Sequence, residues 1–371
     1  MLNKSFEYIT YLIIFIILLF GGIANLYIFE IIGFLFSSIL FLIILYKKKN
    51  MLYPPGSLVF IFFISFQLIS LIWTKNIFNS IEYLLLFLSS LFLNIFFYNF
   101  NQLKTKNIES IIIILGIIFG ILFIFTQIIP IPFLIKILPD TCCSLYTPYS
   151  NNHNLIGDYW VLITVIGIYR YIYKQSLKNI LLISISLTFT ILSQSRSAFL
   201  SLLVALYLIF NNQEFPKKIM RYIKIFIYLI LGIFIFLSMG KTTIFSRPYY
   251  FQGIFSLFKN PMGVGMGNFR ELTKNSEFGL STLAGSSAAK AHNIFLEVFS
   301  GIGFFGISFI LWLLVSLKGV IRNVEKVNFL YLLIFVAISV NFFFNVTYAI
   351  PSMLWIWFIS LAIIQRNASE N

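Results

Sequence analysis

Charged residues are scarce in this chain of 371 residues, of which only 10% are Asp, Glu, Lys or Arg. A soluble domain ordinarily carries about 25% of them, so the composition excludes an ordinary soluble domain with a large core. The apolar residues fall in blocks of roughly twenty, the length at which a helix crosses about 30 Å of hydrocarbon. Because backbone polar groups in lipid must bond within their own segment, such blocks predict transmembrane helices.

Cysteine and histidine are equally rare, with two of each. Cys142 and Cys143 are adjacent, so they cannot join distant segments as a disulfide framework does, and we interpret them as ordinary thiols. The sequence contains no Cys-x-x-Cys, no His-Glu-x-x-His and no clustered Asp pair, which are usual patterns of metal sites. The expected cofactor complement is therefore none.

Acidic residues are outnumbered, with 12 Asp and Glu against 26 Lys and Arg and a net charge of +14. The cations gather in short clusters between the apolar blocks, such as Lys47–Lys49 and Lys217–Lys218, and form no continuous basic face. Nucleic acid is therefore excluded as a partner, and a lipid bilayer is expected instead. Since cytoplasmic loops are rich in Lys and Arg, the clusters predict that both termini face the cytoplasm.

The expected fold is an all-α polytopic membrane bundle of about twelve transmembrane helices, a single domain over residues 1–371. Two segments between these helices are long, 130–154 and 240–291. Long loops are usually functional or disordered, and the aromatic residues of the second favour function. Within it, 247–258 is expected to form a short helix on the membrane surface. The expected transmembrane helices cover residues 7–23, 27–46, 56–73, 79–98, 108–129, 155–173, 178–193, 196–211, 222–239, 292–317, 327–345 and 350–365.

The stretch SQSRSAFLSLL, Ser193 to Leu203, places an arginine where a helix begins. Ser193 or Ser195 is expected to cap that helix, because a serine oxygen accepts the free amide hydrogens of the first turn. Arg196 then lies at the positive end of the helix dipole, where a cation is disfavoured unless an anion accompanies it. A phosphate-binding site is one interpretation. The alternative is an arginine that reaches toward lipid headgroups.

Two further arginines lie on either side of a glycine-rich run. Arg247 precedes Pro248, and Arg270 follows NPMGVGMGNF. The run is no P-loop, since no Gly-Lys-Ser or Gly-Lys-Thr follows it, and tight turns explain its glycines about as well as ligand contact does. Arg270 is a candidate for the same anion site, with a plain surface charge as the alternative.

The stretch AKAHNIFLEVFSGIGFFG, residues 289–306, opens an expected helix with one of the two histidines. The positive end of a helix disfavours imidazolium, which helps His292 to stay neutral and to act as a base near pH 7. Asn293 and Glu297 lie one turn apart and are candidates to orient the histidine or an acceptor. The alternative is a His-Asn pair that only caps the helix. For His153 we prefer a structural interpretation, because neighbouring asparagines explain its surroundings by capping.

Taken in their order, SQSRSAFLSLL, then SRPYYF with NPMGVGMGNF, then HNIFLEVFSGIGFFG resemble the O-antigen ligase and polymerase superfamily over residues 190–310. Residues 70–87 and 151–160 resemble it more loosely. The resemblance implies a metal-independent inverting membrane glycosyltransferase with a GT-C-like helical fold. It implies the bacterial cytoplasmic membrane as the location, with the site on the periplasmic or outer face. The implied donor is an undecaprenyl-diphosphate-linked glycan, and the implied acceptor is lipid A-core or a growing glycan.

The resemblance also carries roles over to matching positions. Arg196 matches the arginine of the family's Ser-Arg motif, Arg247 the arginine before its loop helix, and His292 the histidine of its His-Asn motif. The arginines would bind the diphosphate, assisted by Arg270, and His292 would take the proton from the acceptor hydroxyl. Phe251 stands where the family often has tryptophan, which keeps an aromatic ring but loses the indole N–H.

Three functions remain open from the sequence. An O-antigen ligase and a polymerase of O-antigen, capsule or exopolysaccharide repeat units share this chemistry, and no residue identifies the acceptor. A polysaccharide permease or flippase is a third alternative, which predicts charged residues along a path through the membrane. Away from the ends of the expected helices, we place only Glu30 and Glu82 as charged residues in helix interiors.

Overall fold

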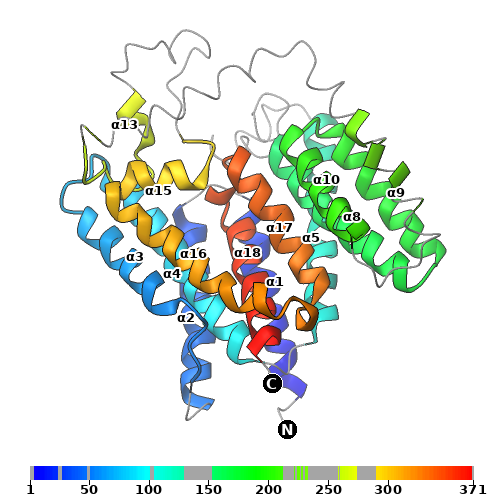
Figure 1. Cartoon of the computed structure of the whole chain (residues 1–371), viewed down its shortest axis with the longest axis horizontal. Coiled ribbons are helices and arrows are strands. Elements are labelled where there is room, and N and C mark those ends of the chain that lie inside the picture. Colours follow the sequence, from blue (N-terminus) through cyan, green and yellow to red (C-terminus); the bar gives the residue numbers. More distant parts are fainter. Residues whose placement is uncertain are drawn as a thin grey trace.

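The computed structural model describes residues 4–23, 27–47, 51–100, 104–128, 153–211, 260–273 and 290–369, together with isolated positions between 221 and 258. Over these residues the chain forms helices joined by turns (Figure 1). The elements are α1 (Lys4–Ile23), α2 (Tyr27–Lys47), α3 (Ser57–Ser70), α4 (Ile77–Asn99), α5 (Thr105–Ile128), α8 (His153–Tyr173), α9 (Leu177–Leu192), α10 (Arg196–Asn211), α13 (Phe269–Thr273), α15 (Ile294–Ile302), η3 (Gly303–Gly306), α16 (Ile307–Arg322), η4 (Val324–Lys326), α17 (Phe329–Phe344), η5 (Thr347–Ala349) and α18 (Pro351–Ser369).

The expected all-α architecture is confirmed for the described residues, and α10 begins and ends at the predicted positions. Four helical stretches are long and apolar enough to cross a membrane: Glu30–Lys47, Ile77–Asn99, Thr105–Leu122 and Ile294–Arg322. The expected helix 222–239 and the expected surface helix 247–258 fall largely outside the described residues. The count of twelve spans therefore stays a prediction.

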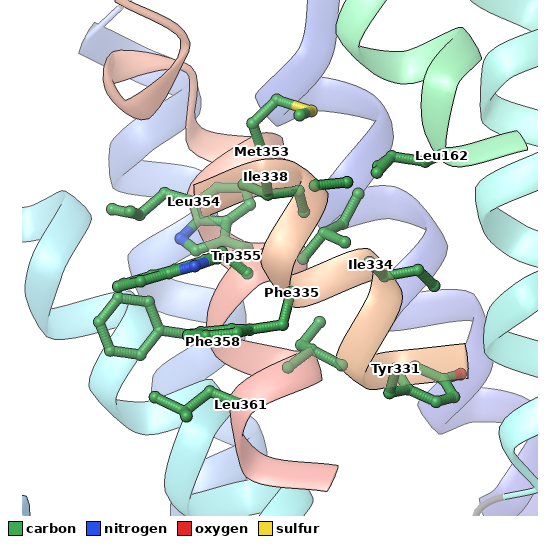
Figure 2. Close-up of a cluster of buried hydrophobic side chains, with 14 of the residues drawn as sticks. Leu162, Tyr331, Ile334, Phe335, Ile338, Met353, Leu354, Trp355, Phe358 and Leu361 are labelled. Atoms are coloured by element: carbon green, nitrogen blue, oxygen red, sulfur yellow. The ribbon is translucent and has the colours of Figure 1, made fainter. Parts of the chain in front are cut away.

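The last helix, α18, lies at the centre of the bundle and packs against α1, α4, α16 and α17. Nearly all of its residues are buried, as is usual for a helix that is apolar on every face. Its tryptophans also find hydrogen-bond partners, since Trp355 Nε1 donates to Ser89 Oγ at 2.7 Å and Trp357 Nε1 donates to Ser339 Oγ at 2.8 Å. Figure 2 shows this core, in which side chains of α17 and α18 meet Leu162 of α8.

The helix expected over 292–317 is interrupted, so this prediction was wrong in its detail. The α-helix α15 ends at Ile302, and a 3-10 turn separates it from α16. In a continuous helix the amide of Phe304 would donate to the carbonyl of Ser300. Here Phe304 N donates to Pro261 O at 3.0 Å, and Ser300 O accepts from Val264 N at 3.0 Å. The loop around residue 263 has thus replaced the helix's own hydrogen bonds.

The starts and finishes of the helices define two ends of the bundle. We call the end where α8, α10, α15 and α18 begin the site end, and the end where α1 begins and α18 finishes the terminal end (Figure 1). The first turn of α1 and the last turn of α18 therefore share one end of the bundle.

Candidate functional site

Arg196 occupies the first turn of α10, where the sequence predicts it. Ser195 caps the helix, because its Oγ accepts from Ala198 N at 3.3 Å and its carbonyl accepts from Phe199 N at 3.2 Å. Gln194 before it adopts a left-handed backbone with φ 51, which forms the sharp turn from α9. The half-buried Arg196 is therefore held at the positive end of a well-formed helix, at the site end.

A buried polar network lies beside this helix start. Asn345 Nδ2 donates to Ser197 Oγ at 3.3 Å and, over a longer 3.4 Å contact, to Asp158 Oδ2. All three side chains are at most 5% exposed. Asp158 and Asn345 are not among the residues predicted from the sequence. A signal for Asp158 was available, because it is one of few acidic residues inside an expected helix.

His292 lies before the helix that it was expected to open. Its backbone is left-handed, with φ 52, an uncommon conformation for a residue other than glycine. The cap of α15 is Asn293, whose Oδ1 accepts from Phe295 N at 2.9 Å and from Leu296 N at 3.1 Å. The capping function foreseen for the His-Asn pair therefore belongs to Asn293, and the half-buried His292 occupies the turn in front of it.

Glu297 acts on the backbone next to the histidine. Its carboxylate Oε2 accepts from Ala291 N at 2.9 Å and from the Tyr348 hydroxyl at 2.9 Å, and the side chain is 1% exposed. Burial raises the pKa of Tyr348 well above its usual range, and the neighbouring Glu297 raises it further, so this hydroxyl keeps its proton and donates. Glu297 thus fixes the residue immediately before His292, a contact that the spacing of four residues did not predict.

Lys290, two residues before His292, adds a positive charge next to this turn. Its ammonium nitrogen lies 5.7 Å from the centre of the Tyr83 ring, within reach of a cation–π interaction. It also interacts electrostatically with Glu30, which in turn interacts with Glu82. Glu30 is 1% exposed, so Lys290 lies within electrostatic reach of a buried acidic group of α2.

The glycine-rich loop, residues 260–268, packs tightly between other elements. The backbone amide of Gly265 donates to Gly301 O at 2.8 Å. A side chain at position 265 would overlap with Thr74. Asn268 Nδ2 donates to Thr74 Oγ1 at 2.8 Å and to Ser80 Oγ at 3.0 Å. Of the two interpretations of these glycines, the described contacts support tight turns, since backbone and side chains of the protein fill the space around them.

Of the two other predicted arginines, the structure describes Arg270 but not Arg247. Arg270 is exposed on α13, directly after the glycine-rich loop, at the site end. Arg247 lies outside the described residues. Within the described ranges, no group of three or more His, Cys, Asp or Glu side chains could hold a metal ion.

One short segment contacts both motif helices. Asn293 Nδ2 donates to Phe343 O at 3.0 Å, and Tyr348 reaches Glu297 of α15. Asn345, between them in sequence, bonds to α10 through Ser197. The end of α17 and the turn that follows it therefore connect the helix that carries Arg196 with the helix that follows His292.

The described part of the chain is thus a helical protein with several helices suited to a membrane, and its predicted polar residues gather at one end. Neither comparison with models of known protein families nor comparison with curated proteins gives a match. The resemblance drawn from the sequence motifs therefore stays a hypothesis.

Proposed function

We propose that this protein is a membrane glycosyltransferase of the O-antigen ligase or polymerase type, with a GT-C-like fold. It would transfer a glycan from an undecaprenyl-diphosphate carrier to a hydroxyl acceptor at the outer face of the bacterial cytoplasmic membrane. The site end would face outward, and both termini would face the cytoplasm.

The observation that carries the proposal is the joint attachment of the two motif helices to residues 343–348. A glycosyl transfer needs a cationic group for the leaving diphosphate and a base for the acceptor within one site. Arg196 lies in the first turn of α10 and His292 lies in the turn just before α15, at the same end of the bundle. The arrangement supports both roles, although the motifs are 96 positions apart in the chain.

In this mechanism His292 takes the proton of the acceptor hydroxyl as its oxygen attacks the anomeric carbon of the donor glycan. The bond between that carbon and the diphosphate oxygen breaks, with inversion, and the diphosphate leaves with the electron pair. Arg196, Arg247 and Arg270 would bind the diphosphate and stabilise the charge that it gains. Asn293 and Glu297 would keep the histidine turn in place through the cap and the Ala291 amide.

Purified protein in nanodiscs, supplied with an undecaprenyl-diphosphate glycan, tests the proposal. One reaction contains lipid A-core and a second does not. Glycan on lipid A-core identifies a ligase, and longer carrier-linked chains in the second reaction identify a polymerase. Transfer to neither acceptor contradicts the proposal.

The arginine role has a matched control on the opposite end of the bundle. Arg196→Ala should reduce transfer at least tenfold, the loss expected when one strong phosphate contact disappears. Arg322→Ala removes an exposed arginine in the last turn of α16, at the terminal end, and should leave transfer unchanged. Equal activities of the two variants would remove Arg196 from the mechanism.

A further inference from the structure

The turn between α17 and α18 presents two polar side chains to different partners. Asn345 ends α17 and reaches Ser197 and Asp158, on the side of the arginine helix. Tyr348, in η5, reaches Glu297 on the side of the histidine turn. Both are 1% exposed, so neither is available to a substrate in this structure.

We propose that Asn345 and Tyr348 are positioning residues for two halves of the site. The arginine half is the first turn of α10, which carries Arg196, and the histidine half is the turn that carries His292. The inference rests on the proposed function and assigns a different positioning residue to each half. Asn345 would set the placement of the first turn of α10, and Tyr348 would set the placement of the turn that carries His292.

The contacts explain why Tyr348 matters for the histidine turn. The Glu297 carboxylate has two hydrogen bonds on Oε2, from Tyr348 and from Ala291 N, whereas Oε1 has no hydrogen bond of ordinary geometry. Without the tyrosine hydroxyl, a buried carboxylate would keep one of these two donors. A buried acceptor that loses a partner shifts toward new ones, so the Ala291 contact would weaken or move.

The same reasoning applies to Asn345 on the arginine side. Its amide nitrogen is the group that joins Ser197 and Asp158, and Asp158 Oδ1 has no hydrogen bond of ordinary geometry. Ser197 follows Arg196 directly and its Oγ lies 3.1 Å from the cap Ser195 Oγ. Removing the amide therefore disturbs the turn that places the arginine.

The two substitutions should affect different kinetic constants. Tyr348→Phe keeps the ring, which packs edge-on against Phe342 with centroids 6.3 Å apart, and removes only the hydroxyl. It should lower kcat about tenfold and change the KM for the glycan donor less than twofold. Asn345→Ala should raise that KM about tenfold, with a smaller change in kcat.

Two buried residues at the terminal end serve as matched controls. Tyr331 is buried and donates through its hydroxyl to Thr105 O at 3.0 Å, and Asn99 is buried and donates to Leu52 O at 2.6 Å. Tyr331→Phe and Asn99→Ala remove the same groups away from the proposed site. Each should leave both kinetic constants within twofold of the wild type.

Hydrogen exchange in nanodiscs supplies a readout that does not depend on transfer. Tyr348→Phe should speed exchange in peptides covering 291–297 and spare those covering 195–201, and Asn345→Ala should do the reverse. Kinetic constants like those of the controls, or a parallel loss in both variants with equal exchange in both peptides, would overturn the inference while the proposed function stands. If the wild type transfers no glycan, the proposed function fails, and the exchange pattern alone decides whether the two residues hold separate halves.

Discussion

The two ends of the bundle differ in how their buried carboxyl groups are bonded. At the terminal end, Glu109 is paired: its Oε2 accepts from Arg170 Nε at 3.0 Å and from Arg170 NH2 at 2.7 Å. At the site end, Glu30, Asp158 and Glu297 are each at most 1% exposed, and each has at least one carboxylate oxygen without a hydrogen bond of ordinary geometry. Taking a carboxylate out of water without a full set of partners costs several kcal/mol.

This contrast indicates what each end contributes. The Glu109–Arg170 ion pair of the terminal end fits a role in stability, because each charge has its partner. Polar groups in membrane helices that lack full satisfaction are expensive, and they are usually retained for function. The incompletely bonded carboxyl groups of the site end therefore support the function that we propose for the end that carries Arg196 and His292.

The largest effect should come from the glycine-rich loop. Gly265 has φ +90, and a Cβ there would overlap with Thr74 and lie 2.8 Å from Ser80 Oγ. Gly265→Ala should therefore lower the free energy of unfolding by about 2–4 kcal/mol, because backbone strain adds to overpacking. Gly319→Ala is the control, since a Cβ added there would meet nothing within 4 Å beyond its own stretch of helix, and in α16 it should stabilise by about 0.5–1 kcal/mol. Unfolding in detergent measures both, and equal effects would contradict the close packing of this loop.

A second pair of substitutions tests the contrast between the ends directly. Glu109→Gln removes the charge that Arg170 binds. It should lower the free energy of unfolding by about 1–2 kcal/mol, because the Glu109 side chain is only 10% exposed. Glu30→Gln replaces a buried carboxyl group by a neutral amide of nearly the same shape and should be neutral or stabilising. Both values come from unfolding of the purified variants. A loss at Glu30→Gln as large as that at Glu109→Gln would remove the distinction between the two ends.

The smallest effect concerns two helix caps with the same chemistry. Asn293 caps α15 and Asn328 caps α17, the latter by accepting from Tyr331 N at 3.4 Å. Substitution of either by alanine should cost about 1 kcal/mol of stability. Only Asn293→Ala should also lower glycan transfer, since it lies next to His292 and bonds to Phe343 O. Equal transfer by the two variants, compared at the same concentration of folded protein, would leave Asn293 with a capping role alone.

Much of the fold was predictable because it depends on local pattern. Apolar blocks and cap residues predicted helix positions closely, and Ser195 was one of two serines expected to cap α10. The interruption at Gly303 was not predictable in the same way. It arises because amides of the distant loop 260–268 replace the helix's own donors, and one sequence does not state which segments meet.

The candidate site shows the same division. Arg196 and His292 stood out as candidates because a charged or titratable residue at a helix start is unusual in an apolar chain. Asn345 and Tyr348 escaped notice, since an isolated Asn and Tyr at the end of an apolar helix are common and their partners lie 148 and 51 positions away. The left-handed backbone at His292 was likewise not expected, because few residues other than glycine adopt it.

The central claim is that the histidine turn carries the chemistry of glycan transfer. The most direct measurement compares wild type, His292→Ala and His153→Ala in nanodiscs with an undecaprenyl-diphosphate glycan and acceptor. These are the chain's two histidines, so the control removes the same group elsewhere. We predict that His292→Ala lowers kcat about 10²–10⁴-fold, the usual contribution of a general base, and that His153→Ala retains activity. Transfer at the wild-type rate by a folded His292→Ala variant would contradict the account.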